Sequence, residues 1–170
     1  RITQIPKDIS INDLPRLITK PFRNKTEKVC AIYCWMSQNI EYDYVGYRKN
    51  TWKNYPSDTS LIFDTYKQRK GVCSGYSHLF KYFLDQIKIP TVVIDGYARV
   101  DIETFYPKES NHSWNAVELD KEWYLFDVTW ASDSTKETDF FWFMTKPEEF
   151  IVSHYPNDTK WTLLTRQIPL

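Results

Sequence analysis

The sequence contains no long hydrophobic run and no excess of either charge. Its apolar stretches are far shorter than the roughly 20 residues that a membrane-spanning helix requires, so we predict no transmembrane segment. Lys and Arg together number 22, as do Asp and Glu, which gives a formal net charge of zero at neutral pH. Balanced charge gives no electrostatic basis for binding nucleic acid or an acidic membrane surface. We therefore expect no nucleic-acid partner.

Internal repeats, low-complexity tracts and interdomain linkers are also absent from the sequence. A chain of 170 residues can bury about 70% of its unfolded surface, which suffices for an independent hydrophobic core. Three prolines predict an extended lead-in over residues 1–23, with one short helix near Asp13 to Thr19. We therefore expect a single domain over residues 1–170.

The sequence begins at Arg1 rather than at a methionine, so we interpret it as a processed or trimmed product. A signal peptide that has been removed in processing would leave no trace in this sequence. For the localisation, we favour an exported or cell-surface protein. Further domains in the full protein are compatible with this interpretation.

Cysteine is scarce, with three residues in the chain. Cys30 and Cys34 lie four apart on a helix predicted from Thr26 to Asn39, where a disulfide between consecutive turns would constrain little. Two cysteines and a distant histidine do not supply the four ligands of a structural zinc site. No carboxylate cluster has the spacing of a calcium-binding loop. We predict no metal and no cofactor, and an odd cysteine count leaves at least one thiol free.

Cys73 is the candidate for a free, reactive thiol, and it lies directly before a stretch with helical periodicity. One apolar face is formed by Tyr76, Leu79, Phe80, Phe83, Leu84 and Ile87, and Pro90 ends the helix. The first turn of a helix has unpaired N–H groups and the positive end of the macrodipole, both of which favour a thiolate. Free cysteines often serve only as buried packing residues. Cys73 lies outside the apolar face, which favours a nucleophile.

A β-hairpin is predicted downstream, with arms at residues 112–119 and 122–130 and a turn between Asp120 and Lys121. This register pairs Leu119 with Glu122. It also places His112 and Asp127 on one face as diagonal neighbours, because side chains alternate along strands. A slip of one residue would put them on opposite faces.

Cysteine, histidine and aspartate in this order can form an acyl-transfer triad. His112 would take the proton of Cys73 and later protonate the leaving amine. Asp127 would fix the imidazole tautomer and stabilise its positive charge. The alternative is that His112 only caps a strand and Asp127 only solvates the end of one, but their placement on one face favours the triad.

The backbone N–H of Cys73 would supply one oxyanion donor at the helix start. An upstream side chain would supply the second, and Gln68, Trp52 and Tyr44 all remain candidates. Trp114 shares the predicted face of His112 and is a candidate substrate contact.

The other two histidines are weaker candidates. His78 lies away from the apolar face of its helix, so we expect it on the solvated surface. His154 precedes Tyr155 and Pro156 in a turn-like stretch, so we expect a structural role. Either would replace His112 as the base only if the hairpin prediction failed.

Several motifs, in order, resemble a known family. They are Lys28 to Trp35, Asn39 to Asp43, Gly71 to Tyr76, His112 to Val117, Trp123 to Trp130 and a closing segment made of Phe140 to Phe143, Pro147 to Phe150 and His154 to Trp161. Together they resemble the transglutaminase-like superfamily, nearest to the branch of kyphoscoliosis peptidase and its bacterial relatives. The similarity extends over about residues 25–164.

The resemblance implies an α+β, papain-like fold in which the nucleophile helix packs against an antiparallel β-sheet. It also implies Cys73 as nucleophile, His112 as base and Asp127 as orienting acid. Family activities include peptide hydrolysis and acyl transfer from glutamine to amines, and some members have lost the triad.

The remaining segments support this core. We expect a surface loop over Val45 to Asp58, a helix over Thr59 to Lys67 and a strand over Thr91 to Val100. A loop over Asp101 to Asn111 and a short strand over Phe140 to Met144 complete the prediction.

Two function classes follow. The first is a thiol-dependent acyl-transfer enzyme that acts on peptide or glutamine amide bonds of a protein or peptide substrate, as a cysteine peptidase, a transglutaminase or an amidase. The second is a non-catalytic binding or scaffolding module that retains the fold. The intact triad favours the enzyme. Whether water or an amine accepts the acyl group depends on groove shape and water exclusion, on which the sequence is silent.

Overall fold

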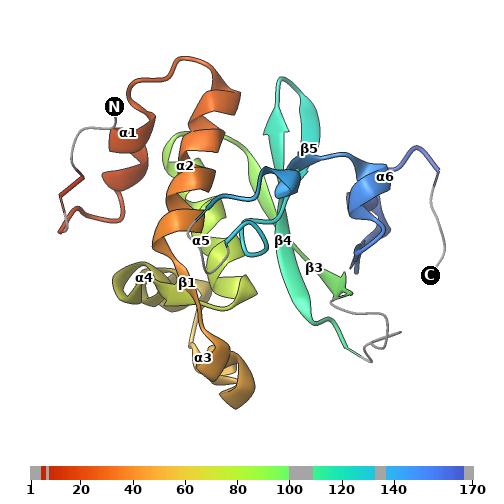
Figure 1. The fold of residues 1–170 in the computed structure, drawn as a ribbon, viewed down its shortest axis with the longest axis horizontal. Coiled ribbons are helices and arrows are strands. Elements are labelled where there is room, and N and C mark those ends of the chain that lie inside the picture. The colour runs from red at the N-terminus through yellow and green to blue at the C-terminus, as the bar shows by residue number, and fades with distance from the viewer. Residues whose placement is uncertain (1–4, 7, 100–108, 133–136, 167–170) are drawn as a thin grey trace.

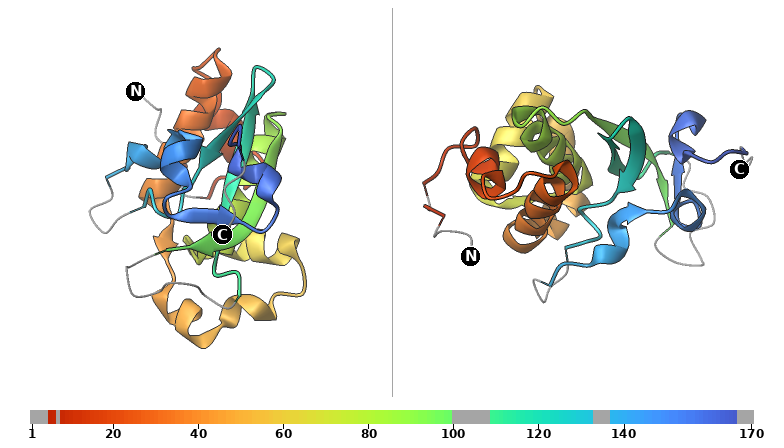
Figure 2. Two further views of the ribbon diagram at one scale, coloured as in Figure 1. Left: turned by 90° about the vertical axis from the view of Figure 1, so that its right-hand side faces the viewer. Right: turned by 90° about the horizontal axis from the view of Figure 1, so that it is seen from above.

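The computed structural model describes residues 5–6, 8–99, 109–132 and 137–166. Helices lie on one side of an antiparallel β-sheet, and the C-terminal segment with helix α6 lies on the other side (Figures 1 and 2). This is the α+β architecture that the sequence predicts. Within the described part of the chain, no helix combines the length and apolarity that crossing a bilayer would require.

Four α-helices form the helical layer. They are α1 (Leu14–Thr19), α2 (Lys25–Asn39), α4 (Asp58–Gln68) and α5 (Cys73–Gln86). The apolar face predicted for the last of these is buried from Tyr76 to Leu84, so α5 lies at the centre of the layer. The predicted helices over 13–19, 26–39 and 59–67 are confirmed to within one residue at each end.

The main sheet has five strands in the order β6-β5-β4-β3-β7. Their bounds are β3 (Thr91–Ala98), β4 (His112–Leu119), β5 (Glu122–Phe126), β6 (Phe143–Thr145) and β7 (His154–Pro156). All neighbouring pairs are antiparallel. A separate parallel pair joins β1 (Glu41–Tyr42) to β2 (Lys70–Gly71) just before α5.

The predicted hairpin register is confirmed, since Leu119 pairs with Glu122 and Val117 with Tyr124. Asp120 and Lys121 both have positive φ, at 51° and 71°, which is the conformation of a two-residue type I′ turn. Such a turn follows the twist of the two strands, so the register is fixed locally. Strand pairing ends at Phe126, four residues before the expected end of the second arm at Trp130, so Asp127 is the first residue beyond β5 rather than a strand residue.

Strand β4 is almost entirely buried because both faces of the sheet are covered. Val117 and Leu119 face the large core against the helices. Trp114 and Ala116 face a second core that includes Phe150 of helix α6 (Pro147–Phe150). The sheet is therefore the middle layer of three.

Two segment predictions are wrong. The expected loop at residues 45–58 contains helix α3 (Tyr44–Lys49) and the 3-10 helix η1 (Thr51–Asn54). The Asp43 side chain caps α3 by accepting a hydrogen bond from the Gly46 N–H, at 3.0 Å, and this capping signal outweighs the polar, aromatic composition.

The expected strand over residues 140–144 begins instead as a 3-10 helix, η2 (Phe140–Trp142), before β6. The Asp139 side chain accepts a hydrogen bond from the Phe141 N–H at 2.8 Å and so starts the helical turn. Strand β3 ends at Ala98, two residues before the expected end. Most of the loop expected at 101–111 lies outside the described residues.

Candidate functional site

The start of α5 and the start of β4 lie together at one end of the molecule. Two polar contacts hold them there: Ser77 Oγ lies 3.0 Å from Ser113 Oγ, and the Asn115 side-chain amide donates to the Ser77 carbonyl at 3.0 Å. Cys73 is the first residue of α5 and His112 is the first residue of β4. The packing of helix on strand thus brings the predicted nucleophile and base to the same end.

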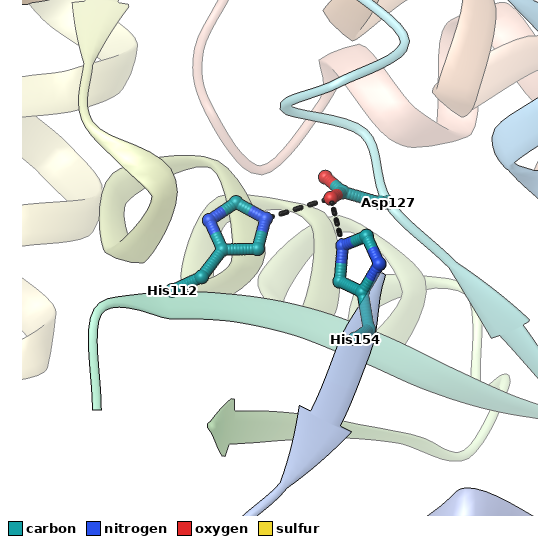
Figure 3. A group of neighbouring side chains, drawn as sticks. All are labelled: His112, Asp127 and His154. Carbon is teal, nitrogen blue, oxygen red and sulfur yellow. Dashed lines mark hydrogen bonds and ion pairs between the residues drawn. The ribbon is translucent and has the colours of Figure 1, made fainter. Parts of the chain in front are cut away.

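His112 and Asp127 are hydrogen-bonded. His112 Nε2 lies 2.7 Å from Asp127 Oδ2, and both side chains are buried (Figure 3). The hairpin pairing brings the two residues near each other, because it holds Phe126, the last residue of β5, opposite Asn115 of β4, and Asp127 follows directly. With Nε2 used by the carboxylate, Nδ1 is the ring nitrogen left for another partner.

Cys73 shares a cavity with His112. The cavity has a volume of about 820 Å³ and is also lined by Trp52, Ser74 and Ser113. Cys73 is 9% exposed, so its sulfur is mostly covered but borders this open space. No side chain caps the N-terminus of α5, which leaves the first-turn N–H groups directed at the cavity end of the helix.

The electrostatics of the site favour a thiolate beside an imidazolium. Burial raises the pKa of the Cys73 thiol, but the hydrogen bond and positive charge of His112, with hydrogen bonds from Ser113, outweigh it and lower that pKa overall. Burial lowers the pKa of His112, but the Asp127 carboxylate and Cys73 outweigh it and raise that pKa to about 10. The proton therefore favours the imidazole over the sulfur.

Asp127 receives three hydrogen bonds. Oδ2 accepts from His112 Nε2 at 2.7 Å and from His154 Nε2 at 3.0 Å, and Oδ1 accepts from the Trp130 N–H at 3.0 Å. Burial raises the pKa of this carboxyl, but the two histidines outweigh it and hold the pKa well below its usual range. The carboxylate is thus buried, charged and anchored at both oxygens.

His154 is a site residue that the sequence did not reveal. It was expected to be structural, in a turn-like stretch, but it starts strand β7 and touches the predicted acid. Only the pairing of β7 with β3 brings it there, with Ala98 opposite His154. A three-residue strand has no detectable alternation, so no local pattern could have identified it.

The four remaining candidates fall in different places. Trp52 lines the Cys73 cavity, and its indole Nε1 is buried without a hydrogen-bond partner among the described residues. Gln68 lines a neighbouring cavity of about 180 Å³ that lacks Cys73, and its amide lies 3.5 Å from Asp64 Oδ1. Tyr44 is 69% exposed and lines a third cavity. Trp114 is fully buried and stacks on His112 with ring centroids 6.0 Å apart. Of the three oxyanion candidates, only Trp52 shares a cavity with the thiol.

The third cavity also borders His112. Its volume is about 480 Å³, and its wall is aromatic, with Tyr42, Tyr44, Tyr47, Trp130 and Trp142 among the lining residues. The Cys73 cavity is more polar and includes Arg48, Asp95 and Glu109. His112 therefore borders two spaces of different chemistry.

The remaining cysteines and His78 lie outside the site. The sulfurs of Cys30 and Cys34 are 4.0 Å apart, in hydrogen-bond contact, and do not form a disulfide. His78 is half-buried rather than solvated, because its Nδ1 lies 2.8 Å from the Ser74 carbonyl and its Nε2 lies 3.6 Å from Asp58. The expectation of a fully solvated His78 is therefore wrong.

One group in the described part of the chain has the composition of a metal site. Ligand atoms of His112, Asp127 and His154 all lie within 4.8 Å of one another. However, both imidazoles point at the same carboxylate oxygen at hydrogen-bond distances. A metal ion bound there would have to replace both N–H protons and move the imidazoles away from the carboxylate. The donor geometry fits a hydrogen-bonded carboxylate better than a ligand set.

Known proteins share this arrangement of elements. The family described as the Transglutaminase-like superfamily matches residues 12–128. The chain is 28% identical over 173 residues to kyphoscoliosis peptidase of Mus musculus, covering 95% of this chain and 25% of that protein. It is 28% identical over 192 residues to the Lim and transglutaminase domain protein ltd-1 of Caenorhabditis elegans, covering 95% and 24%. The chain thus spans about a quarter of the length of these curated relatives.

A solved structure agrees with these matches. The crystal structure named "Putative Cysteine Protease from Cytophaga hutchinsonii" superposes with a TM-score of 0.53 and 28% identity, covering 70% of this chain and 36% of that one. The resemblance and the fold class predicted from the motifs are both confirmed. The chain belongs to the transglutaminase-like superfamily.

Proposed function

We propose that this chain is a thiol-dependent acyl-transfer enzyme that acts on peptide or glutamine amide bonds. In this proposal Cys73 is the nucleophile, His112 is the base and acid, and Asp127 orients the imidazole. The 2.7 Å hydrogen bond from His112 Nε2 to Asp127 Oδ2 is the observation that carries it, because that bond leaves Nδ1 for the thiol in the shared cavity. The directions of the pKa shifts of Cys73 and His112 also support a nucleophilic thiolate.

Acylation would begin with attack of the Cys73 thiolate on the amide carbonyl carbon. A C–S bond forms and the carbonyl electron pair moves to oxygen, which gives a tetrahedral oxyanion. The His112 imidazolium then donates its proton to the amide nitrogen, the C–N bond breaks, and the carbonyl re-forms as a thioester. Asp127 keeps the imidazole in position and stabilises its charge before the proton leaves.

Deacylation would reverse these roles. Water or a primary amine attacks the thioester carbon while neutral His112 takes a proton from it, and the C–S bond breaks to restore the thiolate and imidazolium. Water gives hydrolysis and an amine gives transfer. The aromatic cavity, which His112 also lines, could hold the attacking water or amine, or the part of the substrate chain next to the reacting bond.

The oxyanion needs two hydrogen-bond donors. We propose the backbone N–H of Cys73, at the uncapped start of α5, as one donor. The indole N–H of Trp52 is the second, because it is buried without a partner among the described residues and borders the same cavity. A buried donor without a partner costs about 1–3 kcal/mol, and a substrate oxyanion would relieve that cost.

Turnover tests the proposal directly. The wild-type chain and its Cys73→Ala variant would be incubated with peptide libraries, with and without a primary amine, and products identified by mass spectrometry. We expect products only from the wild type, with the amine incorporated if transfer occurs. The Cys34→Ala variant is the matched control and should behave as the wild type. Equal product from wild type and Cys73→Ala would refute the proposal and leave a non-catalytic binding module.

Thiol reactivity provides a second test that needs no substrate. Iodoacetamide should alkylate Cys73 near neutral pH at least about tenfold faster than Cys30 or Cys34, because its lowered pKa increases the thiolate fraction. The His112→Ala variant should lose that advantage. Peptide mapping after timed labelling would measure all three rates, and equal rates in the folded wild type would argue against a catalytic pair.

A further inference from the structure

We propose that His154 is a positioning residue that anchors the Asp127 carboxylate as a neutral hydrogen-bond donor and so keeps His112 directed at Cys73. This inference rests on the proposed function for its effect on turnover, although the hydrogen-bond arrangement itself is independent of it. His154 lines none of the cavities described above, so it acts through Asp127 rather than on the substrate.

The geometry places two imidazoles on one oxygen. His154 Nε2 lies 3.0 Å from Asp127 Oδ2, the same oxygen that His112 Nε2 contacts at 2.7 Å. Figure 3 shows the two rings reaching the carboxylate from β4 and β7, strands that come from distant parts of the sequence. With the Trp130 N–H on Oδ1, the carboxylate has two anchors besides the histidine it is proposed to orient.

The partners of His154 determine its tautomer. A carboxylate only accepts hydrogen bonds, so Nε2 carries a proton. Nδ1 lies 2.8 Å from the Ser153 hydroxyl oxygen, which can donate to it. Burial, together with the charge of His112, lowers the pKa of His154 against the raising effect of Asp127, so the ring is neutral and Nδ1 accepts from Ser153. His154 therefore anchors the carboxylate without adding a second positive charge that would repel His112.

Aromatic packing prevents the His154 ring from turning away. Its ring centroid lies 4.2 Å from that of Phe150, 4.5 Å from Trp130 and 5.0 Å from Trp114. Trp114 and Trp130 also contact the His112 ring, at 6.0 and 5.4 Å. The same two indoles thus hold both imidazoles at the carboxylate. Orientation of this kind, rather than proton transfer, is what we assign to His154.

The backbone also brings β7 close enough for this contact. Gly96 of β3 pairs with Pro156 of β7. A Cβ at Gly96 would lie 2.6 Å from Trp114 Cη2 and nearer still to the Tyr155 carbonyl oxygen. Only a residue without a side chain allows β7 to approach β3 and Trp114 this closely.

The test compares His154→Leu, which removes the donor, with His154→Gln, whose amide N–H can restore it. We expect kcat to fall about tenfold in His154→Leu with KM changed less than about twofold, since a hydrogen bond to a charged group is lost without a substrate contact. The midpoint of Cys73 alkylation against pH should move upward. His154→Gln should recover most of both. Wild-type behaviour in His154→Leu, or equal losses in both variants, would overturn the proposal.

A nitrogen-15 NMR titration of the His154 ring in the wild-type chain separates the possible failures. We expect a neutral ring protonated at Nε2 at neutral pH, whether or not the chain turns over a substrate. A ring that carries a proton on both nitrogens at that pH, or one protonated only at Nδ1, would refute the positioning role itself. If His154→Leu does not fold, Ser153→Ala serves as the second variant. It should admit the other tautomer or a protonated ring, and an unchanged spectrum would contradict the proposed role of Ser153.

Discussion

At the scale of single residues, the site depends on one buried carboxylate. Asp127 is surrounded by protein, and it remains charged because three donors, one of them the His112 imidazolium, stabilise it. Removing a partner from such a group leaves a buried charge or donor uncompensated, which costs more than the hydrogen bond contributed. Substitutions around Asp127 should therefore affect stability and activity together.

Replacing Asp127 with Asn tests that expectation. If the new amide oxygen accepts from both His112 and His154, the NH2 group faces the Trp130 N–H, and two donors then meet without an acceptor. We expect the free energy of unfolding to fall by about 1–3 kcal/mol and any turnover to fall by at least about a hundredfold. Urea unfolding and initial rates would measure both. A fully stable Asp127→Asn variant would mean that the buried charge is not part of the fold's stability.

The raised pKa of His112 predicts a loss of stability at alkaline pH. The unfolded-state pKa of histidine is about 6.5 and the folded one lies near 10, so the stabilisation is complete below about pH 6.5 and is lost as the pH rises toward 10. The Cys73→Ala variant removes the lowered pKa of the thiol, which opposes the trend, but it also removes the part of the rise in the His112 pKa that Cys73 causes, so the decline should begin at a lower pH than in the wild type. Urea unfolding from pH 6 to 10 should show the decline. The double variant with His112→Gln should show less of it, and identical slopes would contradict the assignment.

At the scale of elements, the short helices of residues 44–54 carry the proposed oxyanion donor. Asp43 caps α3, and Asn50 ends it in the left-handed conformation with φ at 52°. The 3-10 helix η1 then places Trp52 at the cavity of Cys73. A conformation this well specified by local capping is expected to be rigid enough to hold a donor in place.

Trp52→Phe should therefore lower kcat while preserving the fold. The ring remains, but the buried indole N–H is lost, and loss of one oxyanion donor costs about 10²–10³ in kcat. Steady-state kinetics should show KM changed little. Trp123→Phe is the matched control, because Trp123 packs against Trp161 and lines none of the cavities described above. Equal kinetics for the two variants would exclude Trp52 as the donor.

Gly96→Ala tests the approach of β7 to β3. The added Cβ meets the Tyr155 carbonyl and Trp114 Cη2, of which the first is backbone and cannot rotate away. We expect the free energy of unfolding to fall by about 1–3 kcal/mol, as for other overpacked sites. The His154 ring signals should shift with it. A variant as stable as the wild type would mean that β7 lies farther from β3 than described.

The elements differ in how far the sequence determined them. The hairpin was predictable because a two-residue turn and a period of two fix its register locally, and α5 because its apolar face spans several turns. Asp43 and Asn50 supply the cap and the end of helix α3, but the polar and aromatic composition of this segment is typical of a loop, so the sequence predicts one there. His154 could not be predicted, since its place depends on pairing between β7 and a strand more than fifty residues earlier.

At the scale of the whole molecule, His112 lines two cavities whose walls differ in composition. The Cys73 cavity is lined by charged residues of both signs, whereas the aromatic cavity has no charged residue other than His112 among those that line it. A peptide bound across the site would have the residues on one side of the reacting bond in the charged cavity and those on the other side in the aromatic cavity. We therefore expect preference for a large apolar side chain on one side of the reacting bond.

Tyr44→Ala tests this preference with little risk to the fold, because Tyr44 is highly exposed. Loss of its ring should raise KM about threefold or more for substrates with an aromatic side chain on the preferred side, since an aromatic contact contributes about 0.5–1.5 kcal/mol. Substrates with glycine there should be unaffected. A uniform change in KM across the series would contradict an aromatic subsite.

The position of His154 on the last strand along the chain has a consequence for biosynthesis. Cys73, His112 and Asp127 all leave the ribosome before His154, which arrives on the last strand of the sheet. A nascent chain can therefore contain thiol, base and acid while the carboxylate still lacks its second imidazole. If that ring anchors the acid as we propose, full reactivity is delayed until the final strand has docked, and the growing polypeptide is shielded from its own nucleophile.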